Sequence, residues 1–289
     1  LRRQRQMCIR DRYGVNNQFN MQLYTNGYAL NQRLLDNQPG LLSLEVMRVS
    51  LYGHNDTSYT SVTKIPKSYT TVKQNLRNFL QNSSKTKVGV NWIILPGHAT
   101  DVLGVFDMIE DINSTQEKQI QFITLREDFS QNAVYLGDAE RNQLIDIFSE
   151  VESRCASSEY LKHVHIDYGY QLDPIRQGTP NGPLKMVQYT DMNRYGFPQI
   201  ATAIDSLGDL YVYHETGFID RPGADRYTIG NIKKSNVSEI VKTHLEGKGI
   251  APKPFDVSFL DAFDHTISLV LADTYKQENW QEILEYKWK

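Results

Sequence analysis

The stretch KVGVNWIIL (87–95) decides the fold, because it is the clearest strand in the chain and a helical stretch follows it almost at once. From about Asp101 onwards, apolar residues recur at helical spacing: Val102, Val105, Phe106 and Ile109. A strand followed directly by an amphipathic helix is the repeating unit of a parallel sheet covered by helices. The same unit recurs on both sides of this stretch.

Four other segments have the composition of strands: FNMQLYT (19–25), VMRVSLY (46–52), IQFITL (120–125) and VHIDYGY (164–170). Helical stretches separate them, at ALNQRLLD (29–36), Tyr69–Gln81 and Asp138–Ser153. This alternation predicts an α/β fold built from consecutive βα units on a parallel sheet.

After Tyr170 the pattern changes. The segment QLDPIRQGTPNGPL (171–184) is rich in proline and glycine and predicts a loop, and IATAIDSLGDLYVY (200–213) predicts a β-hairpin that turns at 207–209. A last amphipathic helix is expected at Ser258–Tyr275. We therefore predict one barrel-like domain at 13–170, and a C-terminal extension of loop, hairpin and helices at 171–289.

The strands carry polar residues on one face, towards their carboxyl ends. Alternation places Arg48, Ser50 and Tyr52 opposite Val49 and Leu51, Thr124 and Arg126 opposite Ile123 and Leu125, and His163, His165 and Asp167 opposite Val164 and Ile166, while Asn91 shares a face with Gly89. Any one of these side chains could simply satisfy a loop backbone. Their recurrence on four strands favours a barrel whose outer face meets helices and whose inner face lines a ligand-binding mouth.

Charge and cysteine content exclude several classes of protein. The net charge is −3 and the pI is about 6.2, so the chain lacks the overall basic field that favours nucleic acid or an acidic membrane. No apolar run approaches the roughly 20 residues of a membrane-spanning helix. Two cysteines, Cys8 and Cys155, cannot build a disulfide framework, which predicts a cytoplasmic protein.

The order of short motifs LYTNGYAL, MRVSLYG, VGVNWIILPG and FITLREDF resembles the radical S-adenosylmethionine superfamily from its third strand onward. Longer matches, among them HIDYGY, GFPQIATAIDSLGDLYVY and ETGFIDRPGADRYTIG, resemble the ammonia-lyases that deaminate TDP-4-amino-4,6-dideoxyglucose in deoxysugar biosynthesis, from about Leu23 to Asp264. The resemblance implies a partial (β/α) barrel that lacks its first strands. It also implies S-adenosylmethionine and one 4Fe–4S cluster in the full-length parent, a nucleotide-sugar substrate, and an electron donor such as flavodoxin or ferredoxin.

The resemblance assigns roles to several residues. Ser50, Asn91 and Arg126 match positions that contact S-adenosylmethionine, and Thr25 and Asn26 end the strand nearest the substrate. For the sugar, Asp167 and Glu215 are candidates to hold amino or hydroxyl groups, and Arg221 and Arg226 to bind the diphosphate. Simpler readings stay open: Ser50 could bond a loop amide, Asn26–Gly27 could be a turn, and RPGADR (221–226) could be an exposed charged turn. No catalytic residue or metal ligand is assigned; His163 and His165 are interpreted as supporting residues.

Two departures from the family concern the cluster. The family holds its cluster with CxxxCxxC, and this sequence has no such motif. In addition, Tyr213 stands where related enzymes place a cysteine for an auxiliary cluster. The segment MCIRDR (7–12) resembles translated sequencing adapter, so residues 1–12 are expected to be non-native, although a basic N-terminal tail is the alternative. The parent is then expected to be longer by two βα units.

These observations predict a fragment of a radical S-adenosylmethionine enzyme that deaminates a nucleotide-linked amino sugar, with the chain as written binding no cluster. A dehydrogenase or decarboxylase acting on a related sugar keeps the same fold and cofactor, and released ammonia would distinguish the lyase from these. A non-catalytic remnant that binds a nucleotide sugar is the third reading.

Overall fold

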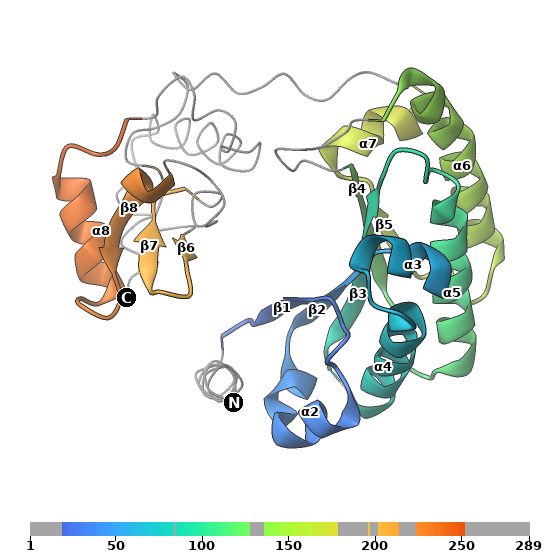
Figure 1. Cartoon of the computed structure of the whole chain (residues 1–289), viewed down its shortest axis with the longest axis horizontal. Helices are drawn as coiled ribbons and strands as arrows, with labels where there is room; N and C mark the ends of the chain where they lie inside the picture. Colours follow the sequence, from blue (N-terminus) through green and yellow to red (C-terminus); the bar gives the residue numbers. More distant parts are fainter. Residues whose placement is uncertain are drawn as a thin grey trace. The chain divides into compact units, whose positions relative to one another are not determined.

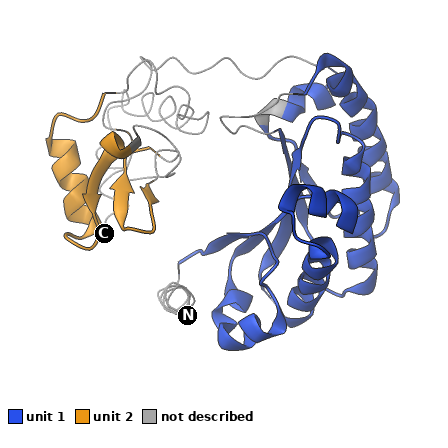
Figure 2. Ribbon diagram, viewed as in Figure 1, with its two compact units in different colours: residues 1–184 blue, residues 185–289 orange. Residues whose placement is uncertain are grey.

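The computed structural model describes residues 19–83, 85–127, 136–178, 196, 202–213 and 224–251. The chain divides into two compact units, Leu1–Leu184 and Lys185–Lys289 (Figure 2). The domain boundary predicted after residue 170 falls inside helix α7 (Gly169–Arg176) of the first unit.

The described part of the first unit contains a five-stranded sheet, with strands β1 (Gln22–Thr25), β2 (Val46–Leu51), β3 (Lys87–Ile94), β4 (Phe122–Glu127) and β5 (His165–Asp167). The strands lie in chain order, and every neighbouring pair is parallel. The connections contain α2 (Gln32–Asn37), the 3-10 helix η1 (Pro39–Ser43), α3 (Asp56–Thr63), α4 (Ser68–Asn82), α5 (Asp101–Thr115) and α6 (Asp138–Ser157). Consecutive parallel strands with helical crossovers are the architecture of a partial barrel, so the predicted α/β fold is confirmed.

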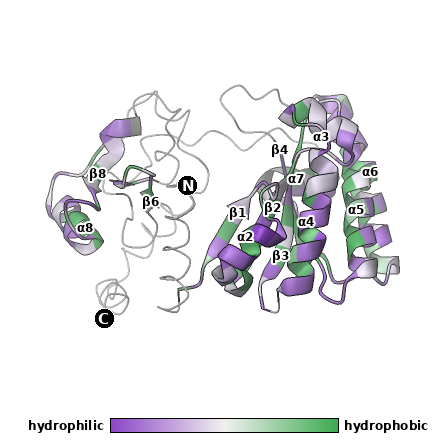
Figure 3. Cartoon of the chain, turned by 60° about the horizontal axis from the view of Figure 1, so that its bottom comes forward, coloured by the Kyte–Doolittle hydropathy of each residue, from purple (hydrophilic) through white to green (hydrophobic). Residues whose placement is uncertain are grey.

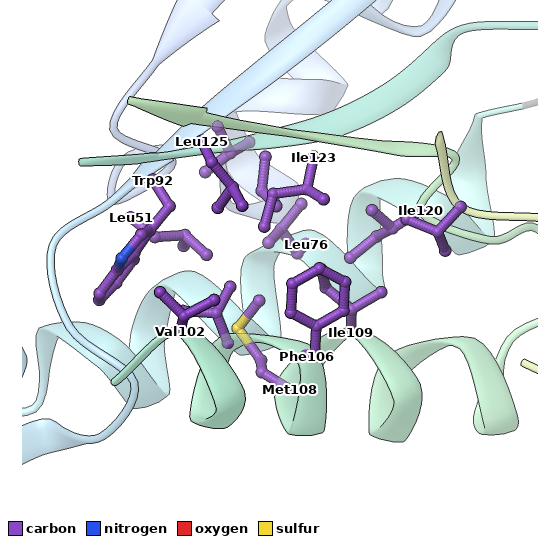
Figure 4. Close-up of a cluster of buried hydrophobic side chains, with 14 of the residues drawn as sticks. Leu51, Leu76, Trp92, Val102, Phe106, Met108, Ile109, Ile120, Ile123 and Leu125 are labelled. Atoms are coloured by element: carbon purple, nitrogen blue, oxygen red, sulfur yellow. The ribbon is translucent and has the colours of Figure 1, made fainter. Parts of the chain in front are cut away.

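The helices α4, α5 and α6 line one face of this sheet (Figure 1). They are amphipathic, and Figure 3 shows hydrophobic and hydrophilic residues alternating along them. Figure 4 shows strand side chains such as Leu51, Trp92 and Leu125 meeting Val102 and Phe106 of α5. All five are at most 3% exposed. The main core of the unit therefore lies between this face of the sheet and the helices, and the strand side chains of opposite parity lie on the other face, which we call the open face.

Two boundaries differ from the predictions. The strand predicted at 164–170 ends at Asp167, because the next residues turn into α7: Gly169 has φ +57°, and its N–H donates to the Asp167 carboxylate at 2.9 Å. The loop predicted from residue 171 is helical as far as Arg176, with Pro174 inside the helix. Helix α3 was not predicted; its capping box joins Asn55 and Ser58.

The second unit contains the predicted hairpin. Strands β6 (Ala203–Ile204) and β7 (Asp209–Tyr211) are antiparallel, and Gly208 in the turn has φ +91°. A third strand, β8 (Thr228–Asn231), pairs with β7 after the 3-10 helix η4 (Ala224–Tyr227), and α8 (Val237–Glu246) packs Ile240 and Val241 against Leu210. These later elements were not predicted. The helix predicted at 258–275 lies outside the described residues.

None of the described helices has both the length and the apolar content that a bilayer crossing needs.

Replacing Asn113 by alanine should destabilise the first unit. The Asn113 side chain is 1% exposed; it donates to the carbonyls of Ile120 and Tyr160 and accepts from the Ile120 N–H at 2.7 Å. Its loss leaves these backbone groups unsatisfied, so we expect a loss of about 1–3 kcal/mol in the free energy of unfolding, measured by urea titration. Exposed Asn82→Ala is the matched control, and equal effects of the two changes would contradict this role.

Candidate functional site

One row of polar residues crosses the open face of the sheet. The strand register pairs Ser50 with Asn91, Asn91 with Thr124, and Thr124 with Asp167. Neighbouring strands lie about 4.8 Å apart, so this row spans about 14 Å, enough to contact a sugar or a nucleoside. Three of the predicted site residues, Ser50, Asn91 and Asp167, are thus brought together on one face.

A second, lower row lies two residues nearer the amino ends of the strands, and it contains an arginine that stacks on aromatic rings. The register pairs Arg48 with Gly89, Gly89 with Phe122, and Phe122 with His165. A Cβ on Gly89 would lie 2.1 Å from the Phe122 ring, so the ring occupies the space that glycine leaves on β3. The Arg48 guanidinium lies 4.5 Å from the centre of this ring and 5.7 Å from that of Tyr24, at cation–π distances.

Hydrogen bonds join the two rows. Arg48 Nη1 donates to Thr124 Oγ1 at 2.9 Å. Because a guanidinium can only donate, the Thr124 hydroxyl accepts from it and directs its own proton towards Asp167 Oδ2, at 3.4 Å. The second oxygen of Asp167 accepts from the Gly169 N–H. The carboxylate is therefore held in place at the carboxyl end of β5.

Asn91 provides an unused acceptor in the centre of the row. Its Oδ1 atom is buried and has no hydrogen-bond partner among the described residues. A buried polar atom without a partner costs free energy. A ligand that donates a hydrogen bond at this point would remove that cost.

Arg126 lies one row further towards the strand ends, paired with Ile93. A guanidinium buried on the inner face would need an anionic partner to offset the cost of burial. In the structure Arg126 is exposed, so that cost does not arise, and no carboxylate of the described residues contacts it.

Thr25 and Asn26 do not join the row. Thr25 pairs with Val49, which faces the helices, and its hydroxyl accepts from the Gly27 N–H at 3.1 Å. The Asn26 side chain accepts from the Tyr28 N–H at 3.1 Å. Both side chains thus form the turn that the simpler reading described. Asn75 of α4 fixes this turn by donating to the carbonyls of Gly27 and Tyr28.

The remaining assigned residues lie elsewhere. Arg226 belongs to the second unit, where its guanidinium lies 4.9 Å from the Tyr227 ring centre, and Glu215 and Arg221 fall outside the described residues. His165 is exposed in the lower row, and His163 precedes β5. Across the described residues, no group of three or more His, Cys, Asp or Glu side chains is arranged to hold a metal ion.

A shallow pocket of about 710 Å³ lies beside β5, and Asp167 forms part of its wall. Two of its carboxylates share one cation: Arg176 contacts Asp173 at 2.9 Å and Glu152 at 3.5 Å. Tyr168 donates to Glu152, and burial raises the pKa of this tyrosine above its ordinary value. Among the described lining residues, Asp167 is the carboxylate without an ion-pair partner.

The chain's cysteines do not fit a 4Fe–4S cluster. Three thiolates at close spacing are required, and the sequence has two cysteines, 147 positions apart as Cys8 and Cys155. Cys155 is partly buried on α6, where burial raises the pKa of its thiol. A raised pKa disfavours the thiolate that ligates iron.

Sequence reasoning missed Arg48 and Thr124 as site residues. On its own strand, Arg48 has the parity of Ser50 and Thr124 has the parity of Arg126, which is the signal that could have identified them. Phe122 was also missed, because its position over Gly89 depends on the pairing of β3 with β4.

No family model matches the chain. The chain is 35% identical over 270 residues to the dTDP-4-amino-4,6-dideoxy-D-glucose ammonia-lyase of Streptomyces venezuelae, and the match covers 90% of this chain and 55% of that protein. The chain thus spans about half the length of this curated relative. The relative confirms the resemblance predicted from the sequence.

Among solved structures, Streptococcus suis SuiB is similar with a TM-score of 0.50 and 11% identity, over 78% of this chain and 49% of that chain. The structure of anSMEcpe with bound AdoMet matches with a TM-score of 0.48 and 12% identity, over 76% of this chain and 56% of that chain. At this identity, the likeness to SuiB supports the fold alone.

Proposed function

We propose that this chain is the substrate-binding part of a radical S-adenosylmethionine enzyme that removes ammonia from a nucleotide-linked amino sugar. The observation that carries the proposal is the 35% identity to an ammonia-lyase for such a sugar along 90% of the chain. Polar groups on the open face support the proposal. Asp167 would hold the amine, while Asn91 and Ser50 would hydrogen-bond its hydroxyl groups or the cofactor.

The chain's own residues can bind and orient a sugar. The Asp167 carboxylate is held in place by two hydrogen bonds, which the Gly169 N–H and the Thr124 hydroxyl donate to it. An ammonium group is attracted to a carboxylate and donates three hydrogen bonds to acceptors around it. Because the cysteines do not fit the cluster, no chemical step is assigned to these residues, and the chain alone is expected to release no ammonia.

Binding of the amino sugar tests the proposal. We expect the chain to bind dTDP-4-amino-4,6-dideoxyglucose at least about tenfold more tightly than dTDP-glucose in calorimetric titrations, because the charge-assisted contact to Asp167 is absent for a hydroxyl. Asp167→Asn should abolish the preference, and exposed Asp36→Asn on α2 should keep it. Equal binding of both sugars by the unmodified chain, or no binding at all, would refute the proposal.

A further inference from the structure

We infer that Arg48 is an oxyanion-binding residue at the floor of the open face, acting with Arg126 on a phosphate or carboxylate group of the ligand. The identity of that ligand rests on the proposed function, but the binding of an oxyanion does not. Neither the resemblance nor the comparisons assign a role to Arg48.

Arg48 carries a positive charge that no carboxylate of the described residues neutralises. The residue is partly buried, and its Nε atom is buried without a hydrogen-bond partner among the described residues. Within the same part of the chain, its side chain donates to the neutral Thr124 hydroxyl and to no carboxylate. No Asp or Glu among the described residues lies within ion-pair distance of it, and Asp167 reaches it only through Thr124. A partly buried cation without a counterion is costly, and an anionic ligand would lower that cost.

The Arg48 guanidinium is held in position before any ligand binds. Gly89 leaves space for the Phe122 ring, and Arg48 stacks on this ring at 4.5 Å. The stacking thereby holds the planar group over the middle strand of the sheet. A prepositioned guanidinium loses little conformational entropy when it forms the forked hydrogen bonds that carboxylates and phosphates accept.

A second cation lies on the same face. Arg126 and Thr124 are two residues apart on β4, about 7 Å along the strand, and Arg48 touches Thr124 from the other direction. Two cations that flank one hydroxyl, neither paired with a carboxylate of the described residues, form a site for an extended anion. The diphosphate of a nucleotide sugar and the carboxylate of S-adenosylmethionine both carry the required oxygens.

The test compares charged and uncharged probes on the 289-residue chain. Calorimetry would measure binding of dTDP, inorganic pyrophosphate and S-adenosylhomocysteine, with thymidine and adenosine as uncharged partners. In Arg48→Met we expect at least about a tenfold loss of affinity for the anionic probes and unchanged affinity for the nucleosides. Arg33→Met, which removes an exposed arginine on α2, should bind all probes like the unmodified chain.

The outcomes separate the sources of the anion. A loss confined to dTDP and pyrophosphate assigns the site to phosphate, and a loss confined to S-adenosylhomocysteine assigns it to a carboxylate; either supports the inference. Arg48→Lys keeps the positive charge but loses the forked donor geometry of the guanidinium. Its affinity for the anionic probes should lie between those of the unmodified chain and of Arg48→Met, which controls for misfolding of the methionine variant. Unchanged binding of every anion in both variants, or no anion binding by the unmodified chain, would overturn it. An intact amine preference with unchanged anion binding in Arg48→Met would overturn this inference and leave the proposed function standing.

Discussion

Replacement of Arg141 by methionine is expected to lower the free energy of unfolding by about 3–5 kcal/mol. Arg141 of α6 and Glu127 at the end of β4 form an ion pair at 2.5 Å, and each residue is 3% exposed. Arg141 also donates through Nε to the Leu136 carbonyl. Without the arginine, the Glu127 carboxylate would remain buried with its main counterion removed, which is the costliest kind of polar defect in a core.

The dependence on pH provides a second check on Arg141. Burial raises the pKa of Glu127, and the neighbouring guanidinium opposes that shift. Removing Arg141 should therefore raise this pKa further. A carboxyl group whose pKa is raised in the folded state makes the protein less stable as the pH rises. The loss of unfolding free energy in Arg141→Met should therefore be largest near pH 7 and become smaller as the pH falls towards 4.5, the ordinary pKa of a glutamate.

Urea unfolding at several pH values measures both effects. The double variant Glu127→Leu with Arg141→Met should recover most of the lost stability, because a hydrophobic pair can replace a buried ion pair. A single Arg141→Met variant that is as stable as the unmodified chain at pH 7, or a defect that grows on acidification, would contradict the argument.

Replacement of Gly53 by alanine should cost about 3 kcal/mol or more. Gly53 follows β2, and a Cβ there would lie 2.2 Å from the backbone nitrogen of Tyr59 and 2.6 Å from the carbonyl carbon of Ser58. Backbone cannot move aside as a side-chain end can, so α3 would have to shift as a whole. Tyr59, which is 2% exposed in the core, would shift with it.

The Gly53→Ala substitution should also weaken ligand binding at the open face. The Tyr59 hydroxyl donates to the Ser50 carbonyl at 3.5 Å, so displacement of α3 disturbs the strand end that carries Ser50. Thermal unfolding measures the loss of stability, and the calorimetric assay with dTDP-4-amino-4,6-dideoxyglucose measures the effect on binding. Gly137→Ala, where nothing lies within 4 Å of the new Cβ, should cost less than about 1 kcal/mol. Similar costs at the two glycines would show that the close approach at Gly53 is unimportant.

Sequence pattern was most informative where one local signal decided the structure. The helical spacing of Val102, Val105 and Phe106 predicted α5, and these side chains are buried against the sheet. Strand alternation likewise placed Ser50 and Asn91 opposite the core, since successive side chains of a strand point to opposite faces.

Other features depended on contacts that a local pattern cannot show. Helix α3 is mostly polar, and its start is stabilised by the capping box between Asn55 and Ser58. Pro174 indicated a loop, yet it is accommodated inside α7. The position of Arg48 follows from a glycine on the next strand and an aromatic ring on the strand beyond, so it became visible only when the register was known.

The chain-order arrangement of β1 to β5 has a consequence for biosynthesis. Each strand pairs with the strand made just before it, and none inserts between two that already exist. During translation the amino-terminal strands emerge first, so each new strand and helix can dock onto the exposed edge of an assembled template. The sheet can therefore grow in the direction of synthesis, one crossover at a time, without waiting for the carboxyl terminus.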